Sequence, residues 1–210
     1  MPEPSRATVV RWPVPIALAV PALAAAIAVT FSGGHSAEFG LVVFAAFGVL
    51  TAVASAIGAG LLPAGTARTG AVLKAVAALA GGVVAAILPL VLGPEPALRA
   101  AALVAVIAGT LALLAVVDLV VGIRSRRADR YGRDWIATGV IEAAGALAVV
   151  AVPPTFFQAF SFTDHGEVVS GALTSSTMIV GLFGAVAAIL GVLLAIAGVG
   201  LVPQRRRAAA

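Results

Sequence analysis

The chain consists of long apolar runs separated by short polar segments. Six runs are long enough to cross the hydrocarbon core of a bilayer, which needs about 20 residues of helix. They cover residues 14–31, 39–62, 70–92, 100–123, 135–160 and 177–201. Because the connections are short, each helix is expected to run antiparallel to the next. No ten-residue stretch alternates between apolar and polar residues, so strands are not expected.

The predicted fold is therefore an all-α membrane bundle of six transmembrane helices, arranged as three antiparallel hairpins within residues 14–201. Weak internal similarity favours the three hairpins. Segments 30–38 and 161–167 both contain a hydroxyl residue, Phe, a second hydroxyl residue, then His and Glu. The second and sixth spans both lead into the pattern Gly-x-Gly-Leu-x-Pro.

Composition agrees with this pattern. The chain is 61% apolar and only 10% charged, whereas soluble domains carry about 25% charged residues. The absence of cysteine excludes a disulfide scaffold, a thiolate metal site and a cysteine nucleophile. The net charge of +4 is spread between apolar runs and forms no continuous surface, so nucleic acid is not an expected partner.

The distribution of basic residues predicts the orientation. Of the 13 Lys and Arg residues, all but Arg99 fall on one side of the predicted spans, and positive charge is retained on the cytoplasmic side. Both termini are thus expected in the cytoplasm, with residues 1–13 before the first span and a basic tail at 202–210, and the protein in the plasma (inner) membrane. The first span can also be read as a signal peptide, but no Ala-x-Ala site follows it, which favours a retained anchor.

Basic residues near the predicted cytoplasmic interface are expected to contact anionic lipid headgroups, at about 1 kcal/mol per charge. These residues are Arg124, Arg126, Arg127, Arg130, Arg205, Arg206 and Arg207. The bilayer is therefore the expected partner. A row of small residues in the last span, Ala187, Gly191 and Ala195, is interpreted as an internal packing surface, with a homo-oligomer as the alternative.

Three ionisable residues, Lys74, Asp118 and Glu142, lie inside predicted spans. At 1.5 Å per residue, Asp118 is about 9 Å and Glu142 about 12 Å from the cytoplasmic ends of their spans, and Lys74 enters from the same side. Lys74 can pair with either carboxylate. One interpretation of these residues is a proton-accepting or ion-coordinating site. The other is a structural cluster, and this second interpretation is favoured because both carboxylates lie away from the membrane midplane, where transport sites usually lie. The hydroxyls of Thr51, Ser55 and Thr110, like that of Thr138, are expected to bond to their own helix, as such hydroxyls often do.

A second set of candidate residues lies in the predicted outer loops and comprises His35, Glu38, Asp164, His165 and Glu167. Two histidines with carboxylates can bind Zn²⁺ or titrate between about pH 5 and 7. The favoured alternative is two solvated loops whose polar residues stabilise the N-termini of the helices that follow. No cofactor is expected.

Part of the chain resembles a known family. Three consecutive features resemble the HdeD-type acid-resistance membrane proteins. They are the run VDLVVGI at 117–123, the Arg-rich turn after it, and Trp135 followed by a Gly-rich span that ends near Pro153. The resemblance covers about residues 100–155 and is architectural elsewhere. It implies a short six-span protein of repeated hairpins that contributes to envelope stress or acid tolerance without known catalysis, and it supplies no catalytic residues.

The segment TFSGGHSA at 30–37 is similar to actinobacterial chains, some of which are labelled acyl-CoA synthetase. An adenylate-forming enzyme needs a large soluble body and a Ser/Thr/Gly-rich loop with a Lys that holds the ATP phosphates. The nearest string, TSST at 174–177, has no Lys and is predicted to lie outside the cell. We therefore expect no enzymatic activity. The alternative function is a small proton- or ion-coupled transporter or channel that uses Asp118 and Glu142.

Overall fold

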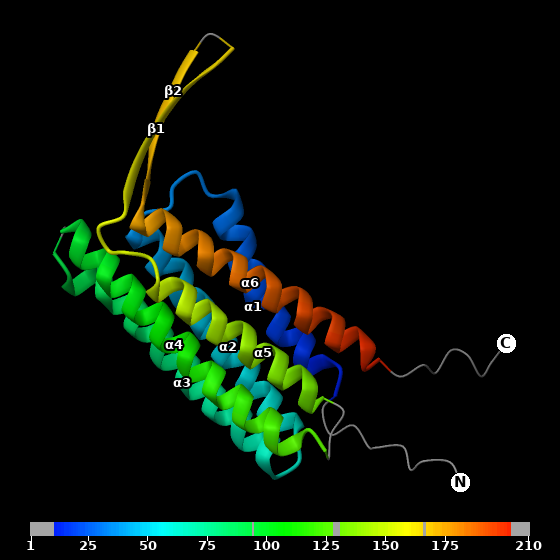
Figure 1. The fold of residues 1–210 in the computed structure, drawn as a ribbon. Coiled ribbons are helices and arrows are strands. Elements are labelled where there is room, and N and C mark those ends of the chain that lie inside the picture. Colours follow the sequence, from blue (N-terminus) through cyan, green and yellow to red (C-terminus); the bar gives the residue numbers. More distant parts are fainter. Residues whose placement is uncertain (1–10, 94, 128–130, 166, 203–210) are drawn as a thin grey trace.

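The computed structural model describes residues 11–93, 95–127, 131–165 and 167–202. They form helices α1 (Pro13–Phe31), α2 (Ala37–Leu61), α3 (Thr66–Val91), α4 (Pro96–Ser125), α5 (Gly132–Val150) and α6 (Ser175–Gly200), and strands β1 (Phe157–Asp164) and β2 (Glu167–Thr174). The helices pack into one bundle, and the two strands form an antiparallel hairpin that projects from one end of it (Figure 1).

Five helices, α1, α2, α3, α4 and α6, fall on expected spans, with ends displaced by at most about one helical turn. These five are long and apolar enough to cross a membrane. Large apolar side chains point outward from them, including Ile27 (58% exposed), Leu90 (83%) and Ile196 (67%). Because such a surface suits lipid and not water, the chain is a multi-pass helical membrane protein.

Side-chain caps define where two of the helices begin. The Ser36 hydroxyl accepts a hydrogen bond from the backbone N–H of Phe39 at 3.1 Å, at the start of α2. The Thr174 hydroxyl accepts one from the backbone N–H of Thr177 at 3.2 Å, at the start of α6. The first N–H groups of a helix have no partner inside it, so these caps satisfy donors that would otherwise be unpaired.

The expected fifth span, 135–160, is wrong at its C-terminal end, because α5 stops at Val150. Pro153 and Pro154 follow closely, and proline lacks a backbone N–H and disfavours helical conformation in the residue before it. The chain then enters β1, in which aromatic and hydroxyl residues pair with β2. The expectation of no strands is therefore wrong as well.

The two segments that share a residue pattern, 30–38 and 161–167, adopt different structures. The first joins α1 to α2 through a short link that ends at the Ser36 cap. The second forms the far end of the β-hairpin, where His165 has a left-handed φ of 48°. The similarity between these segments does not extend to their backbones.

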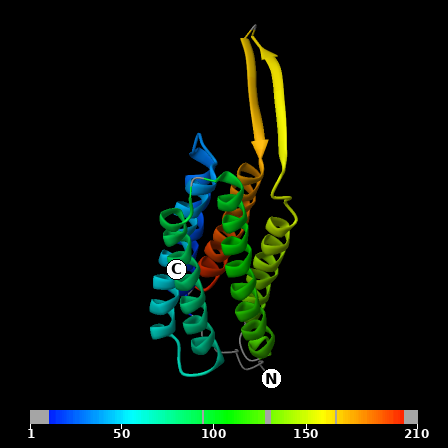
Figure 2. The ribbon, with the colours of Figure 1, turned by 90° about the vertical axis from the view of Figure 1, so that its left-hand side faces the viewer.

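The helices close into a ring, since α1 packs against both α2 and α6 (Figures 1 and 2). The most extensive contacts join α2 to α3, α4 to α5, and α1 to α6. Helices α2, α4 and α6 also contact one another, which places them at the centre and leaves α1, α3 and α5 on the outside. The closest packing thus joins helices of different expected hairpins.

Glycines allow this close packing. A Cβ atom on Gly48 of α2 would lie 2.7 Å from the Cα of Gly82 on α3. A Cβ atom on Gly191 of α6 would lie 2.6 Å from the Leu23 Cγ on α1. Small residues let helix backbones approach closely, and van der Waals packing is the main attraction between helices in lipid.

Aromatic packing fills the half of the bundle nearer the hairpin. Phe44 and Phe47 of α2 surround Phe183 of α6, with ring centroids 5.2 and 5.4 Å from that of Phe183 and 5.8 Å from each other. All three side chains are buried. Such tilted and edge-on pairs stabilise the core beyond the area they bury. The polar interior of the bundle lies in the other half.

Candidate functional site

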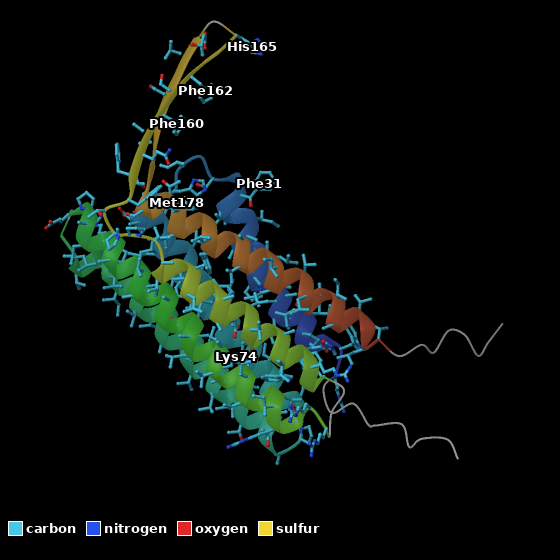
Figure 3. All side chains as sticks on the ribbon, viewed as in Figure 1. Phe31, Lys74, Phe160, Phe162, His165 and Met178 are labelled. Carbon is cyan, nitrogen blue, oxygen red and sulfur yellow. The ribbon has the colours of Figure 1, made fainter. Side chains whose placement is uncertain are left out.

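Three charged side chains from three helices meet inside the bundle. The Lys74 ammonium of α3 donates to Asp118 Oδ2 of α4 at 2.5 Å and to Glu142 Oε1 of α5 at 3.2 Å. The exposed fractions of these side chains are 6%, 1% and 3%. Figure 3 shows Lys74 within the bundle. We call these residues the charge cluster.

The sequence places these residues at one level because neighbouring helices run in opposite directions. Lys74 and Glu142 lie after the first residues of their helices, and Asp118 lies before the last residue of α4; measured along the helix axis, all three separations are about 11 to 15 Å. Gly139 brings α5 close to α4, since a Cβ atom there would lie 3.0 Å from the Ala115 carbonyl oxygen. The structure therefore brings together all three intramembrane residues singled out from the sequence.

Each carboxylate uses only one oxygen to bind Lys74. Asp118 Oδ1 and Glu142 Oε2 are buried and have no hydrogen-bond partner in the described part of the chain. The cluster has one positive and two negative groups, so with all three ionised it carries one uncompensated negative charge. A buried charge of this kind is costly unless it is paired, protonated or hydrated.

Two hydroxyls of α2 face the same interior. Thr51 Oγ1 and Ser55 Oγ are buried and have no hydrogen-bond partner among the described residues. The expectation that they bond to their own helix is wrong. By contrast, the Thr138 hydroxyl does bond to its own helix, donating to the Asp134 carbonyl at 2.9 Å. The four-residue spacing of Thr51 and Ser55, which puts both on one helix face, was the available signal.

Two small cavities adjoin the charge cluster, each of about 20 Å³. Ser55 and Asp118 line one of them. Thr51 and Glu142 line the other. Lys74 and Thr138 line both. Since a water needs at least about 10–15 Å³ of such space, each cavity is large enough for one water molecule.

The candidate residues of the outer set are not gathered into one site. The His35 Nε2 lies 3.0 Å from the Val29 carbonyl oxygen, and Glu38 accepts from Arg99 at 3.0 Å. Asp164 and Glu167 are opposite each other in the backbone register of β1 and β2, at the far end of the β-hairpin. His165 is also there, well away from Phe31 at the end of α1 (Figure 3).

A metal site built from this set therefore finds no support. Within residues 11–93, 95–127, 131–165 and 167–202, no group of three or more His, Cys, Asp or Glu side chains can hold a metal ion. A role of either histidine in sensing pH stays a prediction.

The basic residues expected to contact headgroups are described only in part. Arg124 at the end of α4 and the following Arg126 and Arg127 are exposed. Four others lie outside the described residues: Arg130, Arg205, Arg206 and Arg207.

The chain matches no protein-family model, no curated protein and no solved structure. Its resemblance to the HdeD-type proteins stays a prediction, and the functional argument depends on the charge cluster.

Proposed function

We propose that the chain is a non-enzymatic, six-span protein of the plasma membrane, in which the charge cluster holds α3, α4 and α5 together. The observation that carries this proposal is the Lys74 ammonium, which binds one carboxylate on each of two neighbouring helices in a buried interior. In lipid, polar contacts between helices add to van der Waals packing. A cation shared by two helices therefore suits a structural link.

The proposed topology has six crossings as three hairpins, with both termini in the cytoplasm. Arg68 near the start of α3 and Arg124 near the end of α4 lie at the same end of the bundle, and Arg99 lies at the other end. This distribution agrees with retention of positive charge in the cytoplasm. Helix α5 is the least typical span, because its 19 residues include three charged ones, Arg133, Asp134 and Glu142, and it is not among the five helices apolar enough to cross a membrane.

Single cysteines test this topology, since the native chain has none. We expect a His165→Cys variant to react with a membrane-impermeant maleimide in intact cells. An Arg126→Cys variant should react only after the membrane is permeabilised. Equal labelling of both in intact cells, or the reverse order, would contradict the proposed orientation.

The proposed physiological role is a contribution to envelope stress or acid tolerance, which the HdeD-type resemblance implies. The test is the survival of a deletion strain at low pH and under membrane damage. The strain is complemented with the native protein or with the Lys74→Met variant, and the expressed amount of each protein is measured. We expect the native protein to restore survival. A deletion strain that survives as well as its parent under every such stress would contradict this role.

A second candidate function is proton- or ion-coupled transport through Asp118 and Glu142. It is favoured by two observations: the second oxygen of each carboxylate lacks a partner among the described residues, and each of the two residues lines a water-sized cavity. Proton flux into proteoliposomes under a pH gradient tests it. Transport predicts flux that the Asp118→Asn, Glu142→Gln double variant loses and that Glu38→Gln, at the outer end, retains. Flux no greater than that of empty liposomes would leave the structural function.

A further inference from the structure

The charge cluster has an unbalanced charge and is buried. Lys74 supplies one positive charge against the two carboxylates, and all three side chains are at least nine-tenths buried. Among the described residues, those that form the remaining walls of the two cavities include no second cation. They are formed mainly by apolar residues of α1, α2, α4 and α6 together with the rings of Tyr131 and Trp135. One further positive charge would neutralise the set.

The unpartnered oxygens belong to residues that line the two cavities. Asp118 and Ser55 line one cavity, and Glu142 and Thr51 line the other. In each of these residues one side-chain oxygen is buried and has no hydrogen-bond partner among the described residues. A buried water is stable where it finds two to four polar partners. Each cavity is thus lined by one such carboxylate residue and one such hydroxyl residue, and Lys74 lines both.

The division of these oxygens selects the ligand. Metal cations such as Ca²⁺ and Mg²⁺ need six or more oxygen ligands around one point. Here the four residues that carry these oxygens line two different cavities, each with room for about one water, and Lys74 lines both. A proton needs a single oxygen, and it can be stabilised by one water and one hydroxyl.

We propose that Lys74, Asp118, Glu142, Thr51 and Ser55 form an internal site for one exchangeable proton, with one water in each cavity. The proton forms one O–H bond, at Asp118 Oδ1 or Glu142 Oε2; the O–H bond that breaks is one of a hydronium ion, which becomes a neutral water, and nothing is oxidised or reduced. Lys74 remains charged and binds both carboxyl groups. The hydroxyls of α2 position the waters. The site goes beyond both proposed functions, because a bound proton requires neither transport nor a stress role.

Charge balance gives this site a distinctive signature. In Asp118→Asn or Glu142→Gln, one carboxylate remains against Lys74, and no proton is needed. Each single variant should therefore lose the proton, although each retains one acidic residue. In Lys74→Met, two carboxylates have no counter-ion, and two protons should bind. A carboxyl group protonated for purely local reasons would be lost in only one of the two neutralising variants.

Infrared spectroscopy of the purified full-length protein in lipid tests the proposal, because a protonated carboxyl group has a C=O stretching band distinct from that of a carboxylate. At neutral pH we expect such a band from the native protein, shifted in D₂O, absent in Asp118→Asn and in Glu142→Gln, and about twofold stronger in Lys74→Met. The two neutralising variants suffice if Lys74→Met does not fold. Circular dichroism of each variant checks the fold.

The α2 hydroxyls are tested with the near-isosteric variants Thr51→Val and Ser55→Ala. We expect each to shift the frequency of the band without removing it, whereas Thr110→Val leaves it unchanged. Thr110 is the matched control because it is buried in the same bundle and lines neither cavity.

Three results would overturn the proposal. One is the absence of the band from the native protein, and another is its persistence in either neutralising variant. The third is its loss when Na⁺ replaces choline in the buffer, which would assign the site to a metal cation. If neither α2 variant shifts the band, Thr51 and Ser55 are not part of the site.

Discussion

Gly48 of α2 and Gly82 of α3 face each other where the backbones of these two helices approach closely. A Cβ atom on Gly82 would lie 2.9 Å from the Val49 backbone nitrogen, and one on Gly48 would lie 2.7 Å from the Gly82 Cα. The neighbouring atoms are backbone, which cannot move aside as a flexible side chain can. The separation of α2 and α3 therefore depends on the absence of side chains at both positions.

We expect Gly48→Ala or Gly82→Ala to lower the free energy of unfolding by about 1–3 kcal/mol, because the added methyl group forces the two helices apart. Thermal or denaturant unfolding in detergent measures the change. Gly109→Ala is the control, since a Cβ atom on this α4 glycine would meet nothing within 4 Å. There alanine should be neutral or stabilising by up to about 1 kcal/mol. Equal effects at all three positions would contradict the packing argument.

Loss of the Lys74 side-chain charge should destabilise the bundle strongly. Lys74→Met leaves Asp118 and Glu142 buried without their cation, and breaking a buried ion pair in this way costs about 3–5 kcal/mol. Adding Asp118→Asn and Glu142→Gln to this variant should restore part of the loss. Unfolding in detergent measures all of these variants. Arg68→Met, which removes an exposed charge from the same helix, should change stability by no more than about 0.5 kcal/mol.

The outer ion pair should behave differently from the charge cluster. Arg99 donates to Glu38 at 3.0 Å, but the Glu38 side chain is 59% exposed. Surface pairs of this kind contribute about 0–1 kcal/mol and weaken as salt screens the charges. Glu38→Gln should therefore cost at most about 1 kcal/mol at low salt and less at high salt. A larger loss that is independent of salt would show that this pair is shielded from water.

The β-hairpin should be dispensable for the bundle. Its contacts with the helices are concentrated where β2 joins α6, and its strands otherwise pair with each other. Replacing residues 158–173 with a short Gly/Ser linker keeps the Thr174 cap and should change the stability of the helical part by no more than about 0.5 kcal/mol. Circular dichroism with thermal unfolding measures this. A marked drop in the midpoint would mean that the hairpin packs on the helices.

The positions of five helices could be predicted because a span needs little more than about 20 apolar residues. The end of α5 could not be predicted in the same way. Residues 151–160 are mostly apolar and read as a continuation of the span, but the prolines at 153 and 154 and the pairing of β1 with β2 decide the structure. Pairing between strands depends on a partner segment, which the apolar run itself does not reveal.

The site was predictable where charge alone identified it. Lys74, Asp118 and Glu142 stand out as rare ionisable residues in apolar runs. Thr51 and Ser55 do not, because a hydroxyl on a helix can bond to its own backbone or face a neighbour, and the choice depends on the packing around it. His35 belongs to the link between α1 and α2, and His165 lies at the far end of the β-hairpin. The distance between these two places is set by the tertiary structure, which the sequence pattern does not reveal.

The packing of α1 against α6 has a consequence for biosynthesis. Helix α1 leaves the ribosome before α2 to α6, and its most extensive contact is with α6. The face of α1 that packs on α6 therefore stays uncovered until α6 has been made. Helices α2 to α5 can pair in the order in which they emerge, whereas α1 stays only partly packed until α6 is inserted. Chains truncated before α6 should therefore expose α1 to quality-control proteases, and insertion of α6 becomes the step that completes the bundle.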